Sequence, residues 1–101
     1  MFGLLERDIR YIKQALGSFD EIERAVIFGS RAMGNYKKGS DVDLAIIGTR
    51  ITPEVLYGLT ELLNEEYPLP YFFDILDYHT ISNQKLIEHI DQEGKEIYIK
   101  S

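Results

Sequence analysis

The sequence contains no cysteine and only two histidines, His79 and His89. Without cysteine the chain can form neither disulfide bonds nor thiolate-ligated zinc sites, and it has no thiol nucleophile. Two scattered histidines do not supply a His-rich metal site. Any metal ion that this protein binds is therefore expected to be held by oxygen ligands.

Long apolar segments are also missing. No apolar run approaches the roughly 18 residues of a membrane-spanning helix. The apolar start of the chain, Met1 to Leu5, meets the charged residues Glu6, Arg7 and Asp8 too soon for the hydrophobic region of a signal peptide. We therefore expect a cytoplasmic protein that does not associate with membranes.

Positive charge is scarce and unevenly spread. Eleven Lys and Arg stand against 17 Asp and Glu, a formal net charge of −6. Residues 1–50 hold seven acids and eight bases (+1), whereas residues 51–101 hold ten acids and three bases (−7). Because binding to a phosphate backbone needs a basic face, we expect no direct nucleic-acid binding. A small anionic ligand at the first half, or a basic protein partner at the second, is compatible with this distribution.

The length and composition indicate one folded domain. At 11.7 kDa the chain can bury about 65% of its unfolded surface, which is enough for one core and not for two. With 45% hydrophobic and 28% charged residues, it lies near globular averages. We expect a single domain over residues 1–101.

Hydrophobic periodicity and turn residues predict an alternation of helices and strands. The predicted elements are a helix over 4–16, a strand over 25–28, one helical turn after Ser30, a strand over 42–47, a helix over 53–66, a strand over 71–78, a helix from Ser82 or Asn83 to Gly94, and an extended tail over 97–99. This order predicts an α/β (α+β) fold, a small mixed β-sheet packed by helices.

Two segments carry the functional signal, and the first is the Gly29-Ser30 pair between a predicted strand and a helical turn. Glycine lets the backbone approach an anion closely, and free N–H groups at a helix start point toward it. The pair therefore fits a phosphate-binding turn, although Gly-Ser at a strand end is more often a simple helix cap.

Ten residues later come Asp41 and Asp43. On a predicted strand, residues two apart project from the same face about 6.6 Å apart. Carboxylates so placed can converge on two magnesium ions, which lie about 3.5–4 Å apart in two-metal sites. An isolated Asp-x-Asp at a strand edge is usually solvated surface, so the interpretation depends on the combination with Gly29-Ser30.

A third carboxylate, Asp74, lies among apolar neighbours on the predicted strand over 71–78. We expect such a carboxylate to be paired, protonated or bound to metal. If this strand pairs beside the one bearing Asp41 and Asp43, Asp74 becomes a third oxygen ligand or the base for an attacking hydroxyl. Asp77 is the alternative, but its odd spacing from Asp74 puts it on the opposite face, near the solvated end, so Asp74 is favoured.

These segments resemble a known signature. Gly29-Ser30, the ten-residue gap and Asp41-Val42-Asp43 resemble the motif of the DNA polymerase β-like nucleotidyltransferase superfamily, and the run from Phe73 to Asp77 is similar to its third-carboxylate strand. The length, the Gly29-Ser30-Arg31 start and the run from Ser40 to Ile46 resemble the minimal nucleotidyltransferases. These are antitoxins of two-gene modules whose partner is a helical HEPN-domain ribonuclease toxin.

The resemblance implies an enzyme that transfers AMP from ATP to a hydroxyl, here a tyrosine of the toxin, and releases pyrophosphate. It implies that Gly29, Ser30 and Arg31 contact ATP. It also implies that Asp41, Asp43 and Asp74 hold two Mg²⁺ ions, with Asp74 completing one metal site and activating the acceptor. Met33 stands where the family often has a basic residue, which leaves Arg31 and the loop lysines Lys37 and Lys38 as substitutes.

Two other functions are compatible with the sequence. A non-catalytic, nucleotide-binding antitoxin could neutralise its partner by forming a complex, and the acidic second half would suit docking to a basic surface. A nucleotidyltransferase for a small molecule is the weaker alternative, because this chain is short for enclosing such an acceptor.

Overall fold

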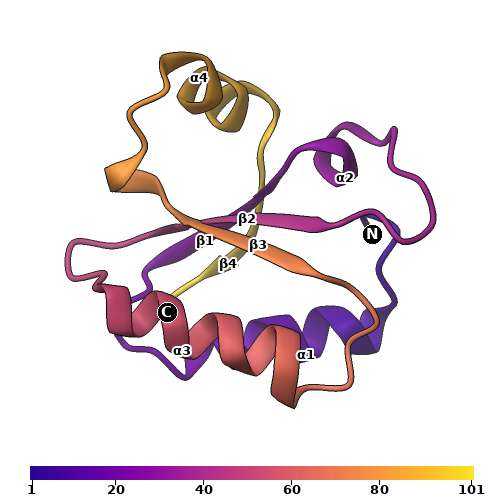
Figure 1. Ribbon diagram of the computed structural model, residues 1–101, viewed down its shortest axis with the longest axis horizontal. Coiled ribbons are helices and arrows are strands. Elements are labelled where there is room, and N and C mark those ends of the chain that lie inside the picture. Colours follow the sequence, from indigo (N-terminus) through magenta and orange to yellow (C-terminus); the bar gives the residue numbers. More distant parts are fainter.

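A computed structural model describes all 101 residues as a four-stranded mixed sheet with helices on both faces (Figure 1). The sheet order is β3-β2-β1-β4; β1 is antiparallel to both β2 and β4, and β2 is parallel to β3. The elements are α1 (Glu6–Gly17), β1 (Arg24–Phe28), α2 (Ser30–Met33), β2 (Val42–Ile47), α3 (Pro53–Glu61), a π-helical turn (Leu62–Glu66), β3 (Phe73–Asp77), a 3-10 turn (Tyr78–Thr80), α4 (Gln84–Glu93) and β4 (Lys95–Ile99). The predicted fold class is confirmed.

The two faces of the sheet bury cores of different size. In Figure 1, α1 and α3 lie along one face and α4 lies on the other. The larger core has 15 buried residues and includes the β2 side chains of Val42, Leu44 and Ile46. The smaller core joins Ala45 of the same strand to Ile90 of α4. Because side chains alternate along a strand, Asp43 shares the face of Ala45 and lies on the α4 side.

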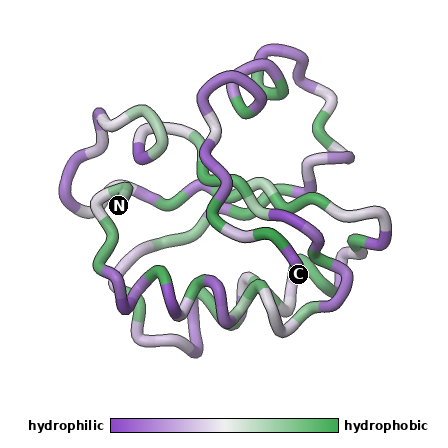
Figure 2. The backbone as a smooth tube through the Cα atoms, turned by 180° about the vertical axis from the view of Figure 1, so that it is seen from behind, coloured by the Kyte–Doolittle hydropathy of each residue, from purple (hydrophilic) through white to green (hydrophobic).

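Figure 2 shows the same arrangement by hydropathy: apolar segments gather in the sheet, and hydrophilic ones dominate the outer turns of the helices and loops. No helix is both long enough and apolar enough to cross a membrane.

Local capping explains where the helices begin. Thr52 caps α3 by accepting a hydrogen bond from the Val55 N–H, with Pro53 in the first turn, as the sequence predicts. Asn83 caps α4 by accepting from the Leu86 N–H at 3.1 Å, which decides between the two predicted caps, Ser82 and Asn83.

Several predicted elements differ from the structure in extent. The predicted helix over 4–16 begins two residues later, as α1 over Glu6–Gly17. The predicted helix over 53–66 is α-helical to Glu61 and continues as the π-helical turn. The predicted strand over 71–78 is shorter and runs from Phe73 to Asp77. At its start, the side-chain amide of Asn64 accepts a hydrogen bond from the Phe73 N–H at 2.7 Å and donates one to the Phe73 carbonyl at 3.1 Å. The extended tail is a full strand, β4, paired with the central strand β1.

Candidate active site

The turn after β1 brings the chain next to Asp43. Gly29 has φ +73° and ψ −155°, a conformation that only glycine adopts readily. A Cβ at this position would lie 2.3 Å from Asp43 Oδ2. Glycine is therefore required twice over, by the backbone conformation and by the close approach of a carboxylate. Ser30 follows as the first residue of α2.

Strand pairing places Asp74 beside Asp43. In the parallel β2–β3 ladder these two residues are direct partners, and across the antiparallel β1–β2 ladder Asp43 pairs with Phe28, which precedes the glycine turn. Asp43 is half-buried, whereas Asp74 is exposed. Asp41 is also exposed and lies just before β2, not on it. The structure thus brings Asp43, Asp74 and the Gly29-Ser30 turn to one end of the sheet.

The electrostatics of this end favour a bound cation. Burial raises the pKa of the Asp43 carboxyl above its ordinary value, and the negative charges of Asp74 and Asp41 raise it further, while His89 opposes the shift. Repulsion among carboxylates is relieved by a divalent cation, and oxygen is the ligand type that Mg²⁺ prefers. No group of three or more acidic or histidine side chains is already gathered closely enough to hold a metal ion. Mg²⁺ does not need such a cage, because it usually binds one or two carboxylates together with substrate phosphates.

His89 belongs to this site although its sequence context gave no indication of a role. Its Nε2 accepts a hydrogen bond from the Gly29 N–H at 2.9 Å, and its ring meets Phe28 edge to face at 6.1 Å. An imidazole nitrogen can accept this bond only when unprotonated. The contact joins residues 60 positions apart. The apolar Ile90 beside His89 marks the buried face of α4 but does not indicate a role for the histidine.

The guanidinium of Arg31 is committed to the protein itself. Arg31 is only 3% exposed; its Nε and Nη2 donate to the Ser40 carbonyl at 3.1 and 2.8 Å, and its Nη1 donates to the Phe2 carbonyl at 2.9 Å. The side chain therefore holds the N-terminal segment and the loop before Asp41 together. These bonds use three of the five N–H donors of the guanidinium, and the contact between this side chain and ATP stays a prediction.

The two candidates for the third carboxylate differ from expectation in their surroundings. The apolar neighbours of Asp74 in sequence suggested a buried carboxylate, but Asp74 is exposed because it faces away from the larger core. Asp77, expected near solvent, is only 8% exposed and accepts a hydrogen bond from the His79 N–H at 3.1 Å. Asp77 thus caps the 3-10 turn, whereas Asp74 remains the carboxylate beside Asp43.

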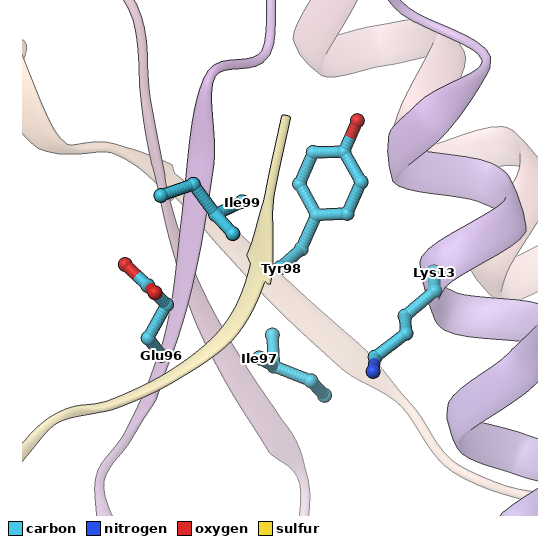
Figure 3. Close-up of a pocket in the computed structure, with 5 residues that line it drawn as sticks. All are labelled: Lys13, Glu96, Ile97, Tyr98 and Ile99. Atoms are coloured by element: carbon cyan, nitrogen blue, oxygen red, sulfur yellow. The ribbon is translucent and has the colours of Figure 1, made fainter. Parts of the chain in front are cut away.

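A hollow of about 430 Å³ lies far from these groups. Figure 3 shows it between α1, which carries Lys13, and the edge strand β4, from which Tyr98 reaches toward the helix. Since β4 is at the opposite edge of the sheet from β3, this hollow is not part of the carboxylate site.

The fold and the carboxylate arrangement define a class of protein. The chain belongs to the nucleotidyltransferase family whose model is described as polymerase beta, nucleotidyltransferase, which matches residues 10–101. No curated protein matches the chain in sequence.

Solved structures share the fold at low sequence identity. One is a toxin–antitoxin complex with AMP-PNP, with a TM-score of 0.72 and 19% identity over 97% of this chain and 76% of the other. Another is the toxin–antitoxin MntA–HepT, with a TM-score of 0.71 and 16% identity over 95% and 74%. A third is a tri-AMPylated Shewanella oneidensis HEPN toxin in complex with an MNT antitoxin, with a TM-score of 0.70 and 16% identity over 94% and 72%.

Proposed function

We propose that this protein is an antitoxin that transfers AMP from ATP to a hydroxyl of a HEPN-domain toxin, with Mg²⁺ as cofactor and a tyrosine as acceptor. The observation that carries the proposal is the pairing of Asp43 with Asp74 beside the Gly29-Ser30 turn. Membership of the nucleotidyltransferase family supports the reaction class. The fold neighbours, an AMP-PNP complex and an AMPylated toxin complex, support the donor and the partner.

We assign roles to the site residues on the basis of the expected family roles and of their surroundings. The backbone of Gly29, Ser30 and Arg31, at the start of α2, is assigned to the phosphates of ATP, because the Arg31 side chain is already engaged. Asp41, Asp43 and Asp74 are assigned to the metal, which when bound would neutralise charge on the phosphates and align the α-phosphorus with the acceptor. We assign to Asp74, which is exposed beside Asp43, the role of taking the proton of the attacking hydroxyl.

The reaction would be an in-line displacement. The acceptor oxygen forms a bond to the α-phosphorus, the bond between the α-phosphorus and its bridging oxygen to the β-phosphate breaks, and pyrophosphate leaves. No covalent intermediate with the protein is required, so positioning and charge neutralisation supply the rate.

The test is transfer of radiolabelled AMP from ATP to the co-expressed partner toxin. We expect Asp43→Asn to lower transfer by more than about 100-fold, since loss of a positioned charge-stabilising group costs that much in other enzymes. Glu93→Gln, an exposed carboxylate at the end of α4, is the matched control and should transfer normally. Equal transfer by Asp43→Asn and the parent would reject the proposal. Neutralisation of the toxin without any transfer by the parent would instead favour the non-catalytic antitoxin.

A further inference from the structure

A second cavity, of about 480 Å³, opens between the N-terminal segment, the loop after α2 and the turn before β3. Three basic side chains line it, Arg31, Lys37 and Lys38, and no acidic residue does. This lining creates a local positive potential that attracts anions.

None of these three cations has a carboxylate partner, because no ion pair of the structure involves them. Arg31 is buried and bonded only to backbone carbonyls. A buried charge without a counter-charge is costly, so an anion beside it would be stabilising. The nearby carboxylate of Asp8 is 1% exposed and accepts from the Tyr71 hydroxyl at 2.9 Å, which keeps it out of the cavity lining.

Two tyrosines give the cavity flat apolar walls. The Arg31 guanidinium carbon lies 5.2 Å from the centroid of the Tyr36 ring and 5.0 Å from that of Tyr71. A Cβ at Gly3 would lie 2.4 Å from the Tyr36 ring, so the glycine allows the N-terminal segment to pack against it. Tyr36 remains 37% exposed and can stack on a planar group.

The cavity is distinct from the carboxylate site. Tyr71 packs against the larger core, on the α1 and α3 side of the sheet, whereas Asp43 lies on the α4 side. The two regions are nevertheless close along the chain, because Gly39 lines the cavity two residues before Asp41.

We propose that this cavity is a second nucleotide site that binds a nucleoside monophosphate, with the phosphate at Lys37 and Lys38 and the base against Tyr36. Lysines suit a phosphate as mobile point charges, and aromatic rings suit any base. This site is additional to the proposed donor site and does not depend on magnesium.

Calorimetric titration of AMP into the full chain in EDTA tests the proposal. We expect one AMP per chain, and weaker binding of adenosine or inorganic phosphate alone. Lys37→Ala with Lys38→Ala should weaken AMP binding at least tenfold, and Tyr36→Ala at least fivefold. The matched control, Lys85→Ala with Lys95→Ala, removes two exposed lysines elsewhere and should change the affinity less than twofold.

Asp43→Asn separates this proposal from the proposed function. Unchanged AMP binding by Asp43→Asn supports a site outside the donor carboxylates, whether or not the parent transfers AMP. The proposal is overturned if AMP does not bind saturably, or if the Lys37/Lys38 and Lys85/Lys95 double variants have the same affinity for AMP. It is also overturned if Asp43→Asn loses AMP binding while the variant without Lys37 and Lys38 keeps it.

Discussion

At the scale of single residues, the site depends on how closely Gly29 and Asp43 approach. The glycine backbone leaves no space for a Cβ beside the carboxylate. Burial of the Asp43 carboxyl raises its pKa, and the neighbouring carboxylates of Asp74 and Asp41 raise it further. A negative charge on Asp43 is therefore unfavourable beside these neighbours, as expected of groups arranged to bind a cation.

Gly29→Ala should destabilise the protein by about 3 kcal/mol, because it adds both a forbidden backbone conformation and a steric clash. Gly34→Ala is the control: its φ is +83°, but a Cβ there meets nothing within 4 Å, so about 1–2 kcal/mol is expected from the backbone alone. Urea denaturation measures both. An equal loss of unfolding free energy in Gly29→Ala and Gly34→Ala would show that the steric contact with Asp43 does not destabilise the protein.

Asp43→Asn should raise the melting temperature at neutral pH. The folded-state pKa of Asp43 lies above its ordinary value of 3.8, so the folded protein binds a proton more tightly than the unfolded chain. In the parent, this group's contribution to stability falls as pH rises from about 3.8 through the raised pKa. The advantage of Asp43→Asn should therefore grow across that window and stay constant above it. Thermal melts from pH 3 to pH 8 test this, and an advantage that shrinks with pH would contradict it.

At the scale of elements, α4 and the π-helical turn each fix one part of the site. His89 of α4 holds the Gly29 amide, and Asn64 of the π-helical turn binds both backbone groups of Phe73 at the start of β3. The first contact sets the glycine turn, and the second fixes the strand that carries Asp74. Both are side-chain contacts to backbone groups that would otherwise lack a protein partner.

His89→Ala should cost about 1 kcal/mol of stability and raise the KM for ATP, because the Gly29 amide loses its acceptor. His89→Gln, which keeps an acceptor oxygen, should restore part of the affinity. His79→Ala is the control, since His79 is exposed and on the 3-10 turn. Unchanged ATP kinetics in His89→Ala would show that the contact is structural only.

Asn64→Leu should cost about 1–3 kcal/mol, because the Phe73 N–H and carbonyl both lose a partner. Hydrogen exchange should accelerate at the start of β3, in particular at Phe73, more than in β1. Uniform protection across both strands would contradict a specific role for this amide.

The sequence predicts the elements whose signals are local. The Thr52-Pro53 cap, the strand from Val42 to Ile47 and the turn at Gly29-Ser30 all depend on neighbouring residues, and each is found as predicted. What the sequence could not predict depends on distant pairing. The exposure of Asp74, the acceptor role of His89 and the β4 strand are decided by segments 30 to 70 residues away, which leave no periodic signal.

At the scale of the whole molecule, β1 is the strand that unites the fold. It pairs with β2 on one side and with β4 on the other, and it leads into the glycine turn. Ile97 of β4 is 5% exposed and completes the larger core. The carboxylate end of the sheet thus depends on a strand at the far edge.

Removal of residues 95–101 should abolish cooperative folding. The loss includes burial of Ile97, about 1.5–3 kcal/mol, and one ladder of backbone hydrogen bonds, from a total stability of about 5–15 kcal/mol. Exposure of the β1 edge should also promote aggregation. Circular dichroism melts and size-exclusion chromatography measure both effects. Ile99→Ser, an exposed position on the same strand, is the control and should melt like the parent.

The pairing of β1 with β4 has a consequence for biosynthesis. On the ribosome, β1 is made about 70 residues before β4. Its β4-facing edge therefore stays unpaired for several seconds at about 5–20 residues per second, although β2 is made soon after β1 and pairs with the other edge. The Gly29 N–H likewise has no His89 acceptor until α4 has been made. An incomplete translation product therefore lacks the hydrogen bond that holds the glycine turn, and the turn is complete only when nearly the entire chain has been made.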